Sequence, residues 1–258
     1  PNAPIVIGTP STQTVTIIDD ERVPTVTLSV GSATLSEAAG TTSVTATLDI
    51  RSAFDVTVTL GAAGTAKEGI DYTVPTTIII PAGVLSYSVT VEAIDESPTL
   101  FEGDETVDLA IVSAIDPNAP IVMGTPSSQT VTIIDNESIP VVTLSTNSSS
   151  ITEGLGTTST SVTATLNGRS GFDVTVTLGT AGTATKDADY TVPTTIVIST
   201  ETLSAFVTLA AIDEIPTLDE LNETVDLSIL SATDPNAPIV VGTPSTQTVT
   251  IIDDERVP

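Results

Sequence analysis

The chain alternates apolar and hydroxyl-bearing residues over most of its length. Residues 25–30 (TVTLSV) and 56–60 (VTVTL) carry Val or Leu at every second position, with Thr or Ser between them. Successive side chains of a strand point to opposite faces, so this alternation is typical of a strand with one buried face. No segment shows the spacing of an amphipathic helix. The pattern predicts an all-β protein.

Short alternating segments separated by Gly, Pro and Asp turns follow one another along the chain. The first series occupies residues 25–30, 33–48, 55–60, 73–80, 84–94, 106–114 and 128–135, and a second series runs from 141 to 255. Seven strands in roughly a hundred residues are typical of an antiparallel β-sandwich with Greek-key connections. We predict tandem Ig-like antiparallel β-sandwiches of about seven strands each.

The chain contains long internal repeats. Residues 1–24 return at 235–258 with one substitution, Ile7 to Val241, and return in more altered form at 117–140. The first copy matches the third better than the second, which favours a unit of two domains that repeats every 234 positions (235 minus 1). Repeats of this kind usually form a spacer, a scaffold or a multivalent surface.

The repeats divide the chain into three parts. Residues 1–23 are interpreted as the last strand of a preceding, truncated repeat, residues 24–138 as a first domain, module 1, and residues 139–258 as a second, module 2. We expect the first part to be disordered, or paired with the sheet edge of a neighbouring molecule. The linkers are short and end in proline, which allows little independent tumbling. An elongated row of modules is therefore expected.

The composition narrows the possible partners. Six basic residues against 33 acidic ones give a formal net charge of -27, which repels nucleic acids and anionic lipid headgroups. An apolar content of 40% and the regular alternation favour a folded chain over an acidic disordered one. Cysteine is absent, so no disulfide stabilises the domains. No apolar run approaches about 18 residues, so we expect no direct insertion into a membrane.

Most carboxylates of module 1 fall in turns at one set of predicted strand ends. They are Glu37, Asp71, Asp95, Glu96, Glu102, Asp104, Glu105 and Asp135. In an antiparallel sandwich, loops separated by an even number of strands lie at the same end, so turns distant in the sequence bring their side chains together. We therefore expect these carboxylates to converge.

Converging carboxylates repel one another unless a cation or proton uptake offsets their charge. The chain has no His and no Cys, so a metal ion would be bound by oxygen atoms alone. Such ligands, about six to eight in number, select a hard cation, and flexible loops favour Ca²⁺ over Mg²⁺. The acidic turns therefore predict a calcium site.

The same residues carry a resemblance to a known family. Module 1 contains SEAAG at Ser36, GTAKEGIDY at Gly64, AIDE at Ala93, EGDE at Glu102 and TVTIIDNE at Thr130. Module 2 contains TEGLG at Thr152, GTATKDADY at Gly182, AIDE at Ala211, ELNE at Glu220 and TVTIIDDE at Thr248. This series resembles the motif set of the Calx-beta family almost element by element, over both modules and the leading strand.

In that family, which includes regulatory domains of sodium/calcium exchangers and modules of integrin subunits and large bacterial surface proteins, the matching positions hold a cluster of Ca²⁺ ions. For module 1 the resemblance implies the ligands Glu37, Asp71, Asp95, Glu96, Glu102, Glu105 and Asp135. For module 2 it implies Glu153, Asp189, Asp213, Glu214, Glu220, Glu223, Asp253 and Asp254. Asn136 stands where module 2 has Asp254, so we expect fewer or weaker ions in module 1. Asp104 is matched by Asn222, which indicates an exposed position and not a ligand.

Two other interpretations of the acidic turns remain open. Acidic loops are also simply solvated in proteins from salty habitats, where surface charge maintains solubility. Two carboxylates suffice for glycoside hydrolysis, but the sequence shows no substrate cleft with aromatic platforms. We therefore expect no enzymatic activity.

The expected function is that of calcium-binding spacer repeats in a large extracellular or cell-surface adhesin, where Ca²⁺ at the module ends stiffens the array. The partners are then neighbouring repeats of the same chain, and surface glycans or proteins would be bound by regions outside residues 1–258. The alternative is a calcium-sensing pair of regulatory domains in a membrane transporter or signalling protein. Near-identical tandem copies favour the spacer, since duplication suits length and multivalency. A third alternative is an accessory module beside an enzyme.

Overall fold

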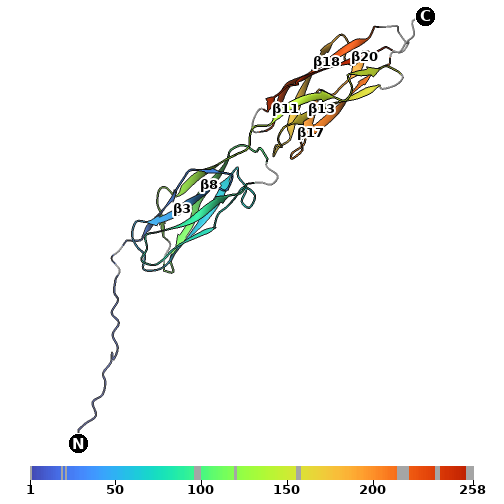
Figure 1. Ribbon diagram of the computed structural model, residues 1–258. Helices are drawn as coiled ribbons and strands as arrows, with labels where there is room; N and C mark the ends of the chain where they lie inside the picture. Colours follow the sequence, from blue (N-terminus) through green and yellow to red (C-terminus); the bar gives the residue numbers. More distant parts are fainter. Residues whose placement is uncertain are drawn as a thin grey trace.

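Two elongated β-domains follow one another in a row (Figure 1). The computed structural model describes residues 2–18, 20, 22–95, 100–118, 121–154, 158–213, 221–235 and 239–253. Within these ranges the regular structure consists of strands, ten in each module, and no helix is long and apolar enough to cross a membrane. The expected all-β fold with tandem sandwiches is confirmed.

The two modules have the same series of strands. Module 1 contains β1 (Thr25–Val30), β2 (Thr34–Ser36), β3 (Thr41–Leu48), β4 (Val56–Gly64), β5 (Tyr72–Thr73), β6 (Thr77–Ile80), β7 (Ser86–Ala93), β8 (Glu105–Ile115), β9 (Val122–Met123) and β10 (Ser128–Ile134). Module 2 contains β11 (Val141–Thr146), β12 (Ser150–Thr152), β13 (Ser159–Leu166), β14 (Val174–Gly182), β15 (Tyr190–Thr191), β16 (Thr195–Ile198), β17 (Ser204–Ala211), β18 (Glu223–Thr233), β19 (Val240–Val241) and β20 (Thr246–Ile252).

Each module is a sandwich of two five-stranded sheets. In module 1 the strand orders are β5-β7-β3-β1-β9 and β2-β10-β8-β4-β6, and module 2 repeats them as β15-β17-β13-β11-β19 and β12-β20-β18-β14-β16. Most neighbouring strands are antiparallel, but β2 pairs with β10 and β1 pairs with β9 in parallel. Consecutive strands alternate between the two sheets, so the chain crosses from one sheet to the other at every connection.

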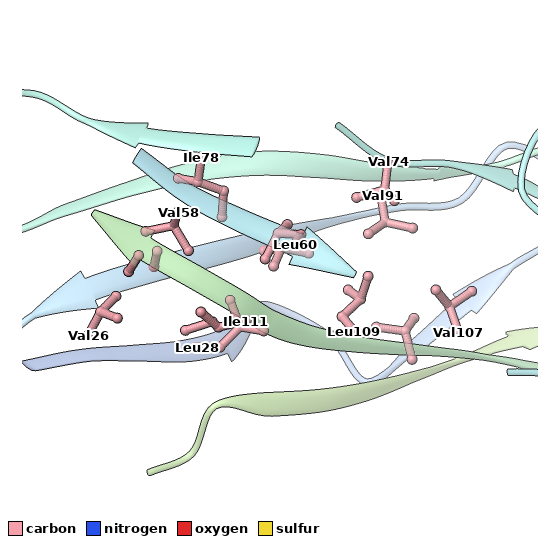
Figure 2. Close-up of a cluster of buried hydrophobic side chains, with 14 of the residues drawn as sticks. Val26, Leu28, Val58, Leu60, Val74, Ile78, Val91, Val107, Leu109 and Ile111 are labelled. Carbon is pink, nitrogen blue, oxygen red and sulfur yellow. The ribbon is translucent and has the colours of Figure 1, made fainter. Parts of the chain in front are cut away.

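The core lies between the two sheets and is almost entirely aliphatic. In Figure 2 side chains from both sheets, among them Val26, Leu28, Val58 and Leu109, point toward one another. These four side chains are fully buried, because the alternation places every second side chain of each strand inward. Burial of such side chains contributes about 1.5–3 kcal/mol each and is the main source of stability.

All seven sequence segments of module 1 form strands, and two of them are divided. Residues 33–48 divide into β2 and β3 at a turn that ends in Gly40, where a Cβ would lie 2.3 Å from the carbonyl oxygen of Ser36. Residues 73–80 divide into β5 and β6. The short strand β9 lies outside the seven segments, and it extends the sheet beside β1.

Residues 2–18 form no strand in this structure. Their apolar side chains are exposed, for example 98% for Ile5 and 92% for Ile17. The equivalent residues of module 1, Ile121 and Ile133, are only 5% and 2% exposed. A closely similar sequence is thus buried where strands such as β8 are present to pair with it.

A direct backbone contact joins the two modules. The amide of Phe101, in the loop before β8, donates to the carbonyl of Arg169 at 3.0 Å. The amide of Gly171, in the loop between β13 and β14, donates to the carbonyl of Phe101 at 2.9 Å. Phe101 and Ser170 are thereby bridged in parallel, and both are buried.

Candidate metal centre

Two groups of three carboxylates lie at the end of module 1 that faces module 2. The first group is Glu37, Asp135 and Glu137, and the second is Asp71, Glu102 and Glu105. In each group, one carboxylate oxygen from every residue lies within 4.8 Å of the others.

The first group forms because β2 and β10 run side by side in the same direction. Their register pairs Ser36 with Ile134, so the residues that follow, Glu37 and Asp135, leave the sheet next to each other. The amide of Glu37 also donates to the carbonyl of Ile134 at 3.0 Å. Two carboxylates about a hundred positions apart are thus placed together by a parallel strand pair.

Asp135 connects the two groups. Its Oδ2 accepts hydrogen bonds from the amides of Glu102 at 3.0 Å and Gly103 at 2.6 Å. Its Oδ1 accepts one from the amide of Glu137 at 2.8 Å. Gly103 has a φ of 80°, a conformation that favours glycine at the turn between Glu102 and β8. Asp135 therefore holds the loop that carries Glu102 against the end of β10.

The second group is formed by the residue before β5 and the start of β8. The carbonyl of Asp71 accepts from the amide of Ile94 at 2.9 Å, which attaches this turn to the end of β7. The start of β8, which carries Glu105, is positioned by the GTA motif that begins at Gly64. Gly64 has a φ of 120°, and a Cβ there would lie only 2.1 Å from the carbonyl oxygen of Thr106. Only glycine allows β4 to lie this close to the first residues of β8.

Burial makes both groups costly in the absence of a counterion. Glu37 and Asp71 are only 4% and 3% exposed, and the Oε2 atoms of Glu37 and Glu137 are sealed from solvent. Burial raises the pKa of Glu105 to about 7, with further contributions from the hydrogen bond and charge of Asp71 and from the charge of Glu102. Lys67 acts in the opposite direction. A cation between these oxygens would offset the repulsion and the lost hydration.

The donor set fits a hard divalent cation. All six side chains offer carboxylate oxygens, which are ligands that Ca²⁺ and Mg²⁺ prefer. Several of these residues lie in turns and not within strands, an arrangement that accommodates the larger and less regular coordination of Ca²⁺. These residues can therefore hold such an ion, and Asp135 of the first group is hydrogen-bonded to the backbone of Glu102 in the second.

Module 2 repeats the parts of this arrangement that the structure describes. Glu153 is 4% exposed, and its amide donates to the carbonyl of Ile252 at 3.2 Å, as Glu37 does to Ile134. Asp189, Glu223 and Asp253 are half-buried at the positions of Asp71, Glu105 and Asp135. The counterparts of Glu102 and Glu137 are Glu220 and Glu255, which lie outside the described residues, so neither complete group can be assembled there.

The structure distributes the sequence-based candidates unevenly. It brings together Glu37, Asp71, Glu102, Glu105 and Asp135. Asp95 and Asp213 are described and exposed, and neither belongs to a group. Glu153, Asp189, Glu223 and Asp253 are described without complete groups, and Glu96, Glu214, Glu220 and Asp254 lie outside the described residues. The ligand set as a whole stays a prediction.

Glu137 was not among the ligands predicted from the sequence, and Asp104 was expected to be exposed. Glu137 follows Asp135 by two positions, and an Asp side chain that accepts from the amide two residues later is a recognisable turn. That signal could have identified Glu137 as part of the cluster. Asp104 is exposed, and its Oδ1 accepts from the amide of Asp135 at 3.2 Å.

Fold and site together define a tandem pair of β-sandwich domains with carboxylate clusters at a module end. The model of the Calx-beta domain family matches residues 19–137 and 135–255, which is nearly the whole chain. The chain therefore belongs to the Calx-beta domain family, as the motifs indicated.

Solved structures include similar tandem domains. CBD12 from CALX1.2 is 18% identical with a TM-score of 0.37, over 88% of this chain and 98% of that one. The calcium binding domain CBD12 of CALX1.1 is 17% identical with a TM-score of 0.37, over 85% and 96%. The apo-form Calx CBD1 domain is 21% identical with a TM-score of 0.38, over 45% and 100%. A comparison with curated protein sequences found no match.

Proposed function

We propose that the chain is a calcium-binding spacer segment of a large extracellular or cell-surface adhesin, in which Ca²⁺ at the module ends stiffens the array. Its direct partners are then neighbouring modules of the same chain. A glycan or protein target would be bound by regions outside residues 1–258. The proposal is for a binding and structural role, without catalysis.

One observation carries the proposal. The two carboxylate groups lie at the end of module 1 beside the linker. Asp135 and Glu137 belong to the group that contains Glu37, and they also form the start of the linker. Pro140, which ends the linker, is buried and immediately precedes β11. A cation bound between Glu37 and these two residues would therefore fix the direction in which the chain leaves module 1.

Glu102 provides a second connection to the neighbouring module. It contributes to the second carboxylate group and directly follows Phe101, whose backbone is hydrogen-bonded to Arg169 and Gly171. An ion bound by Glu102 would also hold the neighbouring backbone of Phe101 that makes this contact. The tandem arrangement of two similar modules supports a role in length and stiffness.

Calcium would act by binding only the folded, aligned loops. At a free concentration a hundredfold above the dissociation constant, one such site stabilises the folded state by about 2.7 kcal/mol. Modules of this type would be stiff in calcium-rich surroundings and more flexible where calcium is scarce. That response suits a protein that works outside the cell.

The proposal is tested by titrating the metal-free chain with Ca²⁺ in a calorimeter and by small-angle X-ray scattering with and without EGTA. We expect saturable calcium binding, weaker response to Mg²⁺, and increased flexibility and protease sensitivity after chelation. A chain that binds no Ca²⁺ would contradict the metal site. Binding with an unchanged scattering profile would contradict the spacer mechanism and leave the site intact.

A further inference from the structure

An asparagine followed by a glycine lies in the turn between β13 and β14. Asn167 is exposed and is attached to Val141, the first residue of β11, by two hydrogen bonds. The amide of Val141 donates to Oδ1 of Asn167 at 2.7 Å, and the amide of Asn167 donates to the carbonyl of Val141 at 3.1 Å. The carboxamide of Asn167 is therefore held in one place at the start of the turn.

Gly168 offers an unhindered backbone nitrogen beside this carboxamide. Its amide has no hydrogen-bond partner among the residues that the structure describes. A Cβ at this position would have no other atom within 4 Å, and glycine itself carries no side chain to block its nitrogen. The nitrogen of Gly168 can therefore approach Cγ of Asn167.

The hydrogen bond from Val141 favours an attack on this carbon. When a nitrogen adds to Cγ of Asn167, negative charge develops on Oδ1. That oxygen already accepts the hydrogen bond from Val141 at 2.7 Å. A donor placed where charge develops lowers the barrier, as in an oxyanion hole. The turn thus combines a free nitrogen, the carbon that it attacks and a donor for the charged oxygen.

Two other exposed asparagines of the described chain lack this combination. Asn147 is followed by Ser148, whose amide donates to a threonine hydroxyl at 2.9 Å. Asn136 is followed by Glu137, whose amide donates to a carboxylate oxygen at 2.8 Å. In both pairs the following nitrogen is already bonded and is hindered by a side chain. Exposure is shared by all three asparagines, so the free glycine nitrogen distinguishes Asn167.

Module 1 shows that the fold accepts a carboxylate at this position. The residue that matches Asn167 is Asp49, whose Oδ1 accepts from the amide of Thr25 at 2.7 Å. This hydrogen bond lowers the pKa of Asp49, and Arg22 acts in the same direction. An aspartate in place of Asn167 would therefore keep the hydrogen bond to the first residue of the module.

We propose that Asn167 is a site of spontaneous deamidation, in which Gly168 supplies the nucleophile and water is the co-reactant. The nitrogen of Gly168 gives its proton to the solvent and bonds to Cγ of Asn167. The Cγ–Nδ2 bond then breaks, and Nδ2 takes up a proton and leaves as ammonia. Water adds to one of the two carbonyl carbons of the resulting succinimide, the C–N bond at that carbon breaks, and the nitrogen regains a proton. Opening at Cγ gives aspartate, and opening at the backbone carbonyl gives isoaspartate.

The two products differ in their effect on the contact between the modules. Aspartate adds a charge and keeps the backbone, as Asp49 does in module 1. Isoaspartate lengthens the backbone by a methylene group just before Arg169, whose carbonyl accepts from the amide of Phe101 at 3.0 Å. The amide of Gly171, in the same turn, donates to the carbonyl of Phe101 at 2.9 Å. Isoaspartate should therefore loosen this contact as the protein ages. The inference goes beyond the proposed spacer role and does not depend on calcium.

The site is tested by ageing the full chain at mildly alkaline pH and mapping its peptides by mass spectrometry. Electron-transfer fragmentation distinguishes isoaspartate from aspartate. We expect Asn167 to react at least about tenfold faster than Asn147, because the nitrogen after Asn147 is hindered and hydrogen-bonded. Gly168→Ala should lower the rate at Asn167 toward that of Asn147, and the open space around Gly168 allows this variant to fold. The inference is overturned if Asn167 reacts no faster than Asn147, or if Gly168→Ala reacts as fast as the unchanged chain.

Hydrogen exchange at Phe101 and Gly171 measures the effect on the contact between the modules. Asn167→Asp is the matched control, because it adds the charge and leaves the backbone unchanged. We expect this variant to protect the two amides as well as the fresh chain does, and the isoaspartate fraction of the aged chain to exchange them faster. Circular dichroism confirms that both modules stay folded. Equal exchange in the fresh chain and in the isoaspartate fraction would overturn the loosening of the contact.

Discussion

Replacing Glu37 with Gln should change the stability of the protein in opposite directions without and with calcium. Glu37 is 4% exposed, and its carboxylate lies within 4.8 Å of those of Asp135 and Glu137. Glutamine keeps the size of the side chain and removes its charge. Without metal the substitution relieves repulsion, and with metal it removes a charged ligand.

The magnitude follows from the separation of the charges. Two unit charges 4.8 Å apart repel by about 3.5 kcal/mol at an effective dielectric constant of about 20. Asp135 and Glu137 are half-buried, so solvent and proton uptake already reduce this repulsion. We expect the free energy of unfolding in EGTA to rise by about 1–2 kcal/mol. Calcium affinity should fall by about tenfold, which corresponds to about 1.4 kcal/mol.

Urea unfolding followed by circular dichroism, in EGTA and in millimolar calcium, measures the first effect, and calorimetric titration measures the second. Glu92→Gln is the matched control, because Glu92 is exposed on β7 and belongs to neither group. It should change stability little under both conditions. If Glu37→Gln destabilises the metal-free protein as much as the calcium-bound one, repulsion between these carboxylates is not the dominant effect and the reasoning is refuted.

Three further predictions use comparisons within the chain. Ile133→Ala should lower the free energy of unfolding by about 2–5 kcal/mol because Ile133 is 2% exposed, whereas Ile17→Ala in the same sequence context should have almost no effect because Ile17 is 92% exposed. Gly64→Ala should destabilise module 1 by about 1–3 kcal/mol or more, since φ is 120° and the new Cβ meets Thr106, while Gly168→Ala, with open space around it, should be nearly neutral. Without calcium, the contribution of Glu105 to stability should fall as the pH rises from 4.5 to about 7. Its pKa is raised in the folded state, which therefore binds more protons than the unfolded state in this range.

Thermal and urea unfolding measure the first two predictions, and stability as a function of pH measures the third. Equal effects of Ile133→Ala and Ile17→Ala would show that residues 2–18 are packed in solution. Equal effects of Gly64→Ala and Gly168→Ala would contradict the close approach of β4 to β8. Glu105→Gln should flatten the pH dependence in EGTA, and an unchanged slope would mean that other groups cause it.

Much of the fold follows from local sequence. Alternation with a period of two identifies inward residues such as Val58 and Leu109 wherever a strand forms, because strand geometry itself places them on one face. Turn residues divide the strands. Gly40 and Gly64 belong to recognisable motifs, and both must be glycine because a Cβ at either position would collide with a backbone carbonyl. The acidic turns containing Glu37, Asp71 and Asp135 could be selected in the same way.

The composition of the carboxylate groups was decided by tertiary structure. Parallel pairing of β2 with β10 places Glu37 beside Asp135, although the sequence analysis assumed only antiparallel neighbours. The carboxylate of Asp135 accepts hydrogen bonds from the amides of Glu137 and Glu102 and so brings them together, while Asp95 is left exposed. The contact between Phe101 and Gly171 was likewise invisible in the sequence.

The sequence by itself therefore determined the strands, the aliphatic core and the acidic character of the turns, since each depends on neighbours within a few residues. Only the tertiary structure decided which turns meet and which loop reaches the next module. Those choices depend on sheet order and strand register, which bring together residues about a hundred positions apart, such as Glu37 and Asp135. No local pattern encodes such a pairing, because any of several sheet orders would bury the same alternating side chains.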